Sequence, residues 1–262
     1  AKDERQADLE VAEESDRAAI ANGLGNIAVL DRYVGTSTSA GRDGYADTVY
    51  AADQGGAVWK FDLRSNAAQT TPFFIATDAD TGGNRQAITG GFEATVAPGG
   101  GVMLFFGTGS FSFEGDKTDA QLQTLYGVMD KPGTTLAGRA SLVRQTVVSQ
   151  ATGTGGGRIT STEPMTPGKL GWYLDLGIAS GSTTAANGER FVGTPRIANG
   201  VVFFPTYEPT ASSSCGGAGA NRLYGLSALS GGAALSQVRI GTPTGTSPGT
   251  GTGAVALDTG GT

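Results

Sequence analysis

The sequence contains no histidine and only one cysteine, Cys215, among its 262 residues. Without histidine, the chain lacks the usual general base near neutral pH and the commonest side-chain ligand of transition metals. A single thiol forms neither an intrachain disulfide nor a zinc site that needs several thiolates. These absences argue against most hydrolase chemistries and against a zinc centre, so we expect a protein that is not an enzyme.

Long apolar runs and concentrations of positive charge are also missing. No stretch of about 18 apolar residues occurs, so we expect no membrane span. The net charge is −6 and the lysines and arginines are scattered along the chain, which leaves no basic stripe that could neutralise phosphates. Nucleic acid is therefore not an expected partner.

Glycine is abundant, with 44 residues, and it separates many short runs of apolar and β-branched residues. Runs of this length, bounded by turn residues, are typical of strands. The pattern predicts strands at 48–51, 57–63, 73–76, 101–106, 125–129, 141–148, 171–176, 190–197, 200–207, 222–226 and 235–240.

Three regions follow from this pattern. Residues 1–21 are rich in helix-forming residues and predict a short helical linker or N-terminal extension. Residues 22–240 predict one all-β domain. Residues 241–262 are a Gly/Thr-rich tail that we expect to contribute little to the core, apart from a short strand near 254–257.

Segments 50–63 and 221–232 share a sequence pattern: a strand ends at a polar turn, and the next strand carries an aromatic residue. Repeated units of four short antiparallel strands predict the blades of a β-propeller, because each small sheet buries its faces only against neighbouring sheets. Four or five such blades are recognisable in the chain.

The chain resembles the C-terminal domain of the PilY family, found on type IV pili. The resemblance rests on motifs in the family's order, namely residues 50–63, 84–89, 106–109, 123–127, 171–176, 188–190, 203–209 and 223–226. It implies a modified β-propeller of about seven four-stranded blades in the family, and whether these residues form the complete ring stays open. It also implies a larger protein whose N-terminal domain lies outside this chain.

The same resemblance implies a function at the pilus tip: pilus biogenesis, a balance of extension and retraction, surface adhesion and twitching motility. The expected partners are minor pilins, the protein's own N-terminal domain, and a host or abiotic surface. The expected location is outside the cytoplasm, at the pilus tip or cell surface, with outer-membrane association or passage through the periplasm.

Family members carry an acidic calcium loop just before the first blade, and residues 31–47 match it in position. The resemblance assigns Asp31, Asp43 and Asp47 as carboxylate ligands and the Tyr45 carbonyl as a further ligand. Calcium favours six to eight oxygen ligands, and alternate positions of a tight turn can direct several toward one centre. Calcium is therefore the expected cofactor, acting as a structural or regulatory ion.

The first half of this loop departs from the family pattern. Read without a gap, Ser39 and Gly41 occupy ligand positions, whereas a looped-out insertion lets Asp31 supply the first ligand. The alternative interpretation makes Arg42-Asp43-Gly44 a turn in which aspartates cap backbone amides. The acidic run 78–84 is interpreted as a solvated turn between strands.

Two other functions remain open at this point. A quinoprotein-like dehydrogenase propeller uses similar hairpin sequences, although the single cysteine excludes the vicinal disulfide of such enzymes. A structural scaffold without any ligand is the other alternative, because the fold by itself does not determine function.

Overall fold

The computed structural model describes residues 23–32, 43–65, 67–150, 157–209, 219–235 and 250–257. These residues form β-strands and two single-turn 3-10 helices, η1 (Glu114–Lys117) and η2 (Gly138–Ser141). Within this part of the chain, no helix is long and apolar enough to cross a membrane. The predicted helix over residues 1–21 and the thiol of Cys215 fall outside the described residues.

The first sheet is the kind of four-stranded unit that the sequence predicts. It contains β1 (Leu24–Leu30), β2 (Thr48–Asp53), β3 (Ala57–Asp62) and β4 (Phe74–Ile75), all antiparallel and in sequential order. The turn between β2 and β3 places Gly56 at a φ of 76°, a conformation that favours glycine. Asp53 fixes this turn by accepting hydrogen bonds from the Ala57 N–H and the Trp59 indole, both at 2.8 Å.

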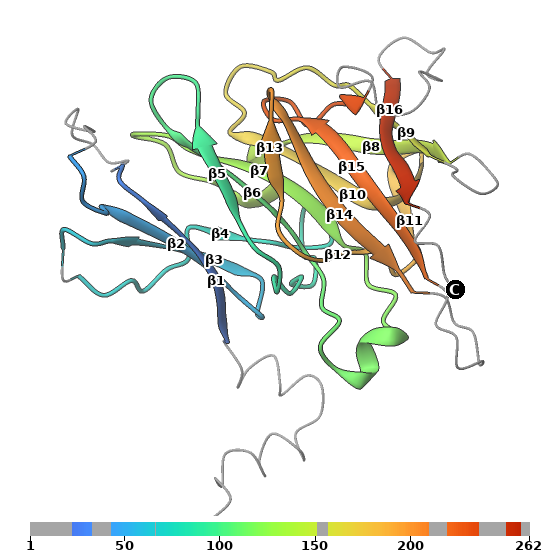
Figure 1. Cartoon of the computed structure of the whole chain (residues 1–262), viewed down its shortest axis with the longest axis horizontal. Coiled ribbons are helices and arrows are strands. Elements are labelled where there is room, and N and C mark those ends of the chain that lie inside the picture. Colours follow the sequence, from blue (N-terminus) through green and yellow to red (C-terminus); the bar gives the residue numbers. More distant parts are fainter. Residues whose placement is uncertain are drawn as a thin grey trace, which may run out of the picture.

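Two further antiparallel units follow, and Figure 1 shows them beside the first sheet. The second unit consists of β5 (Glu93–Val96), β6 (Val102–Gly107), β7 (Thr124–Asp130) and β10 (Gly171–Ser180). The third unit consists of β12 (Arg190–Phe191), β13 (Arg196–Ala198), β14 (Val201–Glu208), β15 (Ala220–Ser227) and β16 (Thr250–Leu257). Both units resemble a blade in their antiparallel pairing, but β8 (Val143–Gln150) and β9 (Arg158–Ser161) intervene in the chain between β7 and β10, and β12 and β13 both pair with β14.

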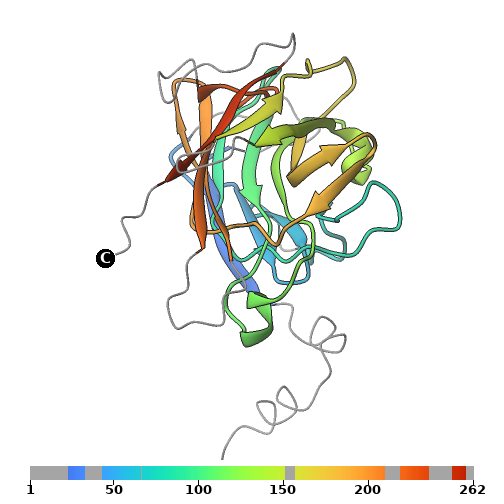
Figure 2. The same ribbon diagram turned by 90° about the vertical axis from the view of Figure 1, so that its right-hand side faces the viewer.

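The second and third units differ from separate blades because additional strands join them. Strand β8 runs parallel to β10, β9 pairs with β8 and β16, and β11 (Thr183–Ala186) pairs with β10. The result is one 12-stranded sheet. This sheet curls strongly on itself, as the view along its side shows (Figure 2).

Strand β16 corrects the expectation for the Gly/Thr-rich tail. Residues Thr250–Leu257 lie between β15 and β9, paired with both, and Ala254 is completely buried in the core. The strand is longer than the short run expected at 254–257. A small residue suits this position because the Thr160 side chain of β9 fills the adjacent space: a Cβ on Gly253 would lie 2.2 Å from Thr160 Oγ1.

The core lies between the units, with the second unit covered on both faces. Phe106 and Tyr126 of the second unit pack with Phe74 of the first sheet. On its other face, Phe105 and Trp172 pack with Phe204 and neighbouring residues of the third unit. Trp172 is fully buried and is therefore part of this core.

Candidate functional site: three converging carboxylates

Asp31, Asp43 and Asp47 meet at one end of the first sheet. One oxygen from each carboxylate lies within 4.8 Å of the others. The register of the sheet brings two of them together: Leu30 pairs with Thr48, so the residues beyond this pair, Asp31 and Asp47, lie side by side. The backbone continues this pairing, because the Asp47 N–H donates to the Leu30 carbonyl at 2.9 Å.

Backbone amides orient two of the three carboxylates. The N–H groups of Asp43 and Gly44 donate to the two oxygens of Asp31, at 3.2 and 3.0 Å. The Tyr45 N–H donates to Asp43 Oδ1 at 2.9 Å, an arrangement in which an aspartate bonds the backbone two residues ahead. Gly44 has a φ of 93°, which few other residues adopt. These contacts hold residues 43–45 against Asp31.

The three carboxylates of the cluster differ in burial, and together they concentrate negative charge. Asp47 is buried, Asp31 is half-buried and Asp43 is exposed. The nearest cation recorded among the described ion pairs is the Arg64 guanidinium, whose Nε lies 4.0 Å from Asp47 Oδ1 and 3.4 Å from Asp62. Three carboxylates this close repel one another, and a bound cation would relieve that repulsion.

The donor set suits a hard divalent cation. Carboxylate oxygens are ligands that calcium prefers, and the remaining positions of its shell are commonly filled by backbone carbonyls and water. The side chain of Tyr45 is 77% exposed and is not the group assigned to the metal. Its carbonyl stays a predicted ligand, and the loop positions Ser39 and Gly41 fall outside the described residues.

The alternative interpretation of this loop as a turn is partly correct. The bonds from Gly44 and Tyr45 show that Asp31 and Asp43 cap backbone amides, as a turn requires. Capping leaves further lone pairs on each carboxylate, so the turn and a cation site are compatible. The looped-out alignment, in which Asp31 is the first ligand, agrees with the observed convergence of Asp31, Asp43 and Asp47.

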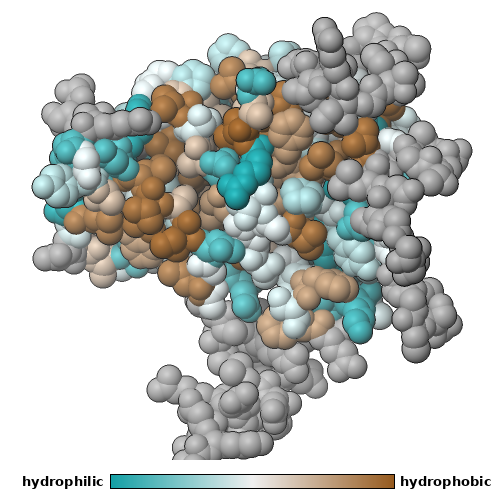
Figure 3. Space-filling model, in the orientation of Figure 1, coloured by the Kyte–Doolittle hydropathy of each residue, from teal (hydrophilic) through white to brown (hydrophobic). Residues whose placement is uncertain are grey.

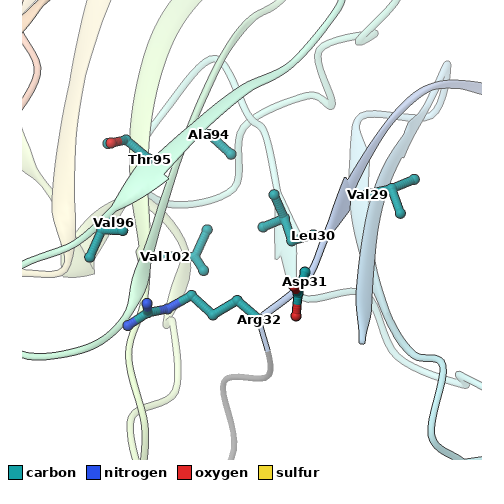
Figure 4. A pocket seen from close by; sticks show the side chains of 8 residues that line it. All are labelled: Val29, Leu30, Asp31, Arg32, Ala94, Thr95, Val96 and Val102. Atoms are coloured by element: carbon teal, nitrogen blue, oxygen red, sulfur yellow. The ribbon is translucent and has the colours of Figure 1, made fainter. Parts of the chain in front are cut away.

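Sequence reasoning missed Arg32, which connects this cluster to the second unit. Its guanidinium donates to the Gly100 carbonyl at 2.7 Å, in the turn between β5 and β6. Both Asp31 and Arg32 line a pocket of about 220 Å³ between β1 and the strands β5 and β6. Figure 4 shows Arg32 extending below Val102, toward the second unit. Only an assembled pair of sheets reveals this contact.

The second acidic run, 78–84, is a turn, as interpreted. Asp78 Oδ1 accepts the Asn84 N–H at 2.8 Å, and Asp78 Oδ2 accepts the side-chain amides of Asn84 and Gln121, both at 3.2 Å. This carboxylate therefore serves the loop itself. Among the described residues, the only group of three possible metal ligands of this kind is the one formed by Asp31, Asp43 and Asp47.

Comparison with known proteins assigns the chain, rather than this site, to a family. No protein-family model matches the chain. A type IV pilus biogenesis factor PilY1 homolog of Xylella fastidiosa is 40% identical over 233 residues, which cover 84% of this chain and 15% of that protein. The chain belongs to the PilY family. The PilY1 of Pseudomonas aeruginosa strain PAO1 is 28% identical over 259 residues, which cover 82% of this chain and 21% of that protein.

The fold agrees with this assignment. The crystal structure of the Pseudomonas aeruginosa PilY1 C-terminal domain superimposes with a TM-score of 0.68 at 23% identity, over 89% of this chain and 54% of that chain. The expected all-β fold of the PilY C-terminal domain is confirmed. The chain thus spans a small part of its full-length PilY relatives and about half of the solved domain.

Proposed function

We propose that this PilY chain is a binding module of a type IV pilus biogenesis factor and that it catalyses no reaction. Its identity to a PilY1 homolog, 40% over 233 residues, supports the pilus role. Within that role we assign it to the pilus tip or cell surface, where it would support the balance of extension and retraction, adhesion and twitching motility. Minor pilins, the N-terminal part of the same protein and an external surface are the proposed partners.

The observation that carries the finer proposal is the convergence of Asp31, Asp43 and Asp47 within 4.8 Å. Their carboxylates would hold calcium, together with the Tyr45 carbonyl. A bound calcium ion would supply positive charge that offsets the repulsion among these carboxylates. The chain contributes the carboxylate oxygens of Asp31 and Asp43, which the N–H groups of residues 43–45 already orient.

Occupancy of the site would act on the joint between the first sheet and the second unit. Asp31 ends β1 and is followed by Arg32, which bonds the Gly100 carbonyl of the second unit. Restraining Asp31 therefore also restrains the residue that connects the two. We propose that calcium stabilises this joint and, through it, the surface that the module offers to its partners.

Calcium titration by calorimetry and thermal unfolding, with and without chelator, tests the site. A ligand at about 100 times its Kd stabilises the folded state by about 2.7 kcal/mol. Asp43→Asn is the sharpest variant, because the amide oxygen can still accept the Tyr45 N–H while the charge is lost. Asp119→Asn, in an exposed loop where the carboxylate accepts the Gln121 N–H at 2.8 Å, is the matched control.

We expect saturable calcium binding in the native chain and in Asp119→Asn, and at least roughly tenfold weaker binding in Asp43→Asn. If calcium produces neither a binding heat nor a rise in melting temperature in the native chain, the metal site is refuted. The pilus role is tested separately, by replacing Asp31, Asp43 and Asp47 with asparagine in the natural protein. The number of surface pili and the rate of twitching motility are then measured. Calcium binding in vitro with unchanged pili and motility would favour a purely structural ion.

A further inference from the structure

The segment after β3 brings a positive charge to the end of the first sheet that carries the three converging carboxylates. The Leu63 N–H, just after β3, donates to the Asp47 carbonyl at 2.8 Å. On the other side, the Asp47 N–H donates to the Leu30 carbonyl of β1 at 2.9 Å. Asp47 therefore lies between the end of β1, followed by Asp31, and the segment after β3, which contains Arg64.

Asp62, the last residue of β3, positions the Arg64 guanidinium. Asp62 Oδ1 accepts the Arg64 backbone N–H at 2.9 Å and the Arg64 Nε–H at an Nε–Oδ1 distance of 3.4 Å. An aspartate that bonds the backbone two residues ahead fixes a tight turn. Within the described part of the chain, the converging group of three carboxylates does not include Asp62. This residue therefore serves Arg64 rather than the proposed metal.

The guanidinium faces the most buried of the three carboxylates. Arg64 Nε lies 4.0 Å from Asp47 Oδ1, close enough for an ion pair but too far for a hydrogen bond. The Asp47 side chain is 10% exposed and the Arg64 side chain is 43% exposed. Burial strengthens the attraction, because little water screens Asp47. Hydrophilic residues gather at the left-hand end of the molecule in Figure 3, where the first sheet ends in Figure 1, so the Arg64 side chain borders solvent into which it can move.

The guanidinium and a metal ion make competing demands on Asp47. When no cation is bound, three carboxylates within 4.8 Å repel one another, and the guanidinium offsets part of that repulsion. When calcium binds, its two positive charges repel the guanidinium and occupy the Asp47 carboxylate. Calcium binding therefore weakens the contact between Arg64 and Asp47, and by linkage that contact weakens calcium binding to the same extent.

We propose that Arg64 is a built-in competitor of the metal: its guanidinium neutralises Asp47 until calcium displaces it. This inference rests on the calcium site proposed above and assigns to Arg64 the role of setting its affinity. Calcium sites range in Kd from about 10⁻⁹ M to about 10⁻³ M, according to ligand charge and rigidity. A competing positive charge moves this site toward the weak end of that range, which is typical of extracellular calcium modules.

Calcium titration of Arg64 variants by calorimetry tests the competition. Arg64→Gln removes the charge and keeps much of the side-chain length, so we expect it to bind calcium at least about threefold more tightly than the native chain. Arg64→Lys keeps the charge, so its affinity should stay closer to the native value. Lys117→Gln is the matched control. It removes one positive charge from an exposed residue of η1, which Figure 1 shows apart from this end of the first sheet, and should leave the affinity unchanged.

A measurement without calcium shows whether the guanidinium acts on Asp47. In chelator, Arg64→Gln should lower the melting temperature by about 1–3 °C, as expected for the loss of a partly exposed ion pair. In Asp47→Asn the same substitution should have a smaller effect, because the carboxylate charge is already gone. At saturating calcium, the melting temperature of Arg64→Gln should equal or exceed the native value, since the competitor is absent.

The outcomes separate this competition from the metal site itself. Calcium binding by the native chain, with equal or weaker affinity in Arg64→Gln, would overturn the competition and leave the metal site intact. Equal effects of Arg64→Gln in the native and Asp47→Asn proteins in chelator would also overturn it, because the guanidinium would then act elsewhere. No calcium binding by the native chain would refute the site and the competition together.

Discussion

Arg139 donates to both carboxylate oxygens of Asp175, at 2.7 and 2.9 Å, and both side chains are buried. The same guanidinium bonds the Thr77 carbonyl and Asp80 of the loop after β4, and it stacks on the Tyr173 ring at 3.9 Å. The pair thus connects η2, the loop after β4 and strand β10. It is a buried charged contact between the first sheet and the second unit.

Arg139→Met should destabilise the chain by about 3–5 kcal/mol, because it leaves the Asp175 carboxylate buried without its partner. Arg139→Lys keeps the charge but replaces three separately bonded nitrogens by one ammonium group, so its loss of stability should be smaller than that of Arg139→Met. Urea unfolding of the three proteins measures both effects. Equal stability of native protein and Arg139→Met would show that Asp175 is solvated or protonated in the folded state.

The loss of stability caused by Arg139→Met should also depend on pH. Burial raises the pKa of Asp175, and the Arg139 guanidinium opposes part of that rise. A carboxyl whose pKa is higher in the folded than in the unfolded state loses stability as the pH rises between the two values. Removing Arg139 raises the folded pKa further, so the deficit of Arg139→Met should be larger at about pH 7 than at about pH 4.5. A deficit independent of pH would contradict this cause.

Gly127→Ala should destabilise the core by about 1–3 kcal/mol through overpacking. A Cβ at this position in β7 would lie 2.4 Å from Cε2 of the Trp172 indole, which is fully buried and bonded to the Ala228 carbonyl at 3.0 Å. Gly25→Ala is the control, because its nearest neighbours would lie at 3.6 and 3.8 Å. The midpoints of urea unfolding of the two variants measure this effect. Equal midpoints for Gly127→Ala and Gly25→Ala would refute the steric explanation.

Asp116→Ala should loosen one loop without unfolding the sheets. Asp116 Oδ2 accepts the Ser110 hydroxyl and the N–H groups of Ser112 and Phe113, at 2.7, 2.7 and 2.9 Å. Bonds to a charged acceptor each contribute about 1.5–3 kcal/mol, so amide exchange at residues 112 and 113 should accelerate by at least about tenfold. Lys117→Ala is the control within the same turn. Unchanged exchange in Asp116→Ala would show that other contacts hold the loop.

Sequence patterns located many of the strands, for a local reason. Short apolar runs between glycine-rich turns are enough to predict strands such as 57–63 and 101–106, which the structure places at Ala57–Asp62 and Val102–Gly107. Strands β1, β5, β9 and β11 escaped prediction. Their burial is weak or partial, as in β1 and β5, or their run is only four residues long, as in β9, so the local pattern carries little signal.

The sequence by itself determined the all-β class, the strands with clear apolar runs and the acidic residues around the first hairpin, because each follows from neighbouring residues. Tertiary structure alone decided that Arg32 bonds the Gly100 carbonyl, that β16 enters the sheet, and that Arg139 pairs with Asp175. These contacts join residues that are distant in the chain. They depend on strand register and on desolvation in a packed core, which no local pattern encodes.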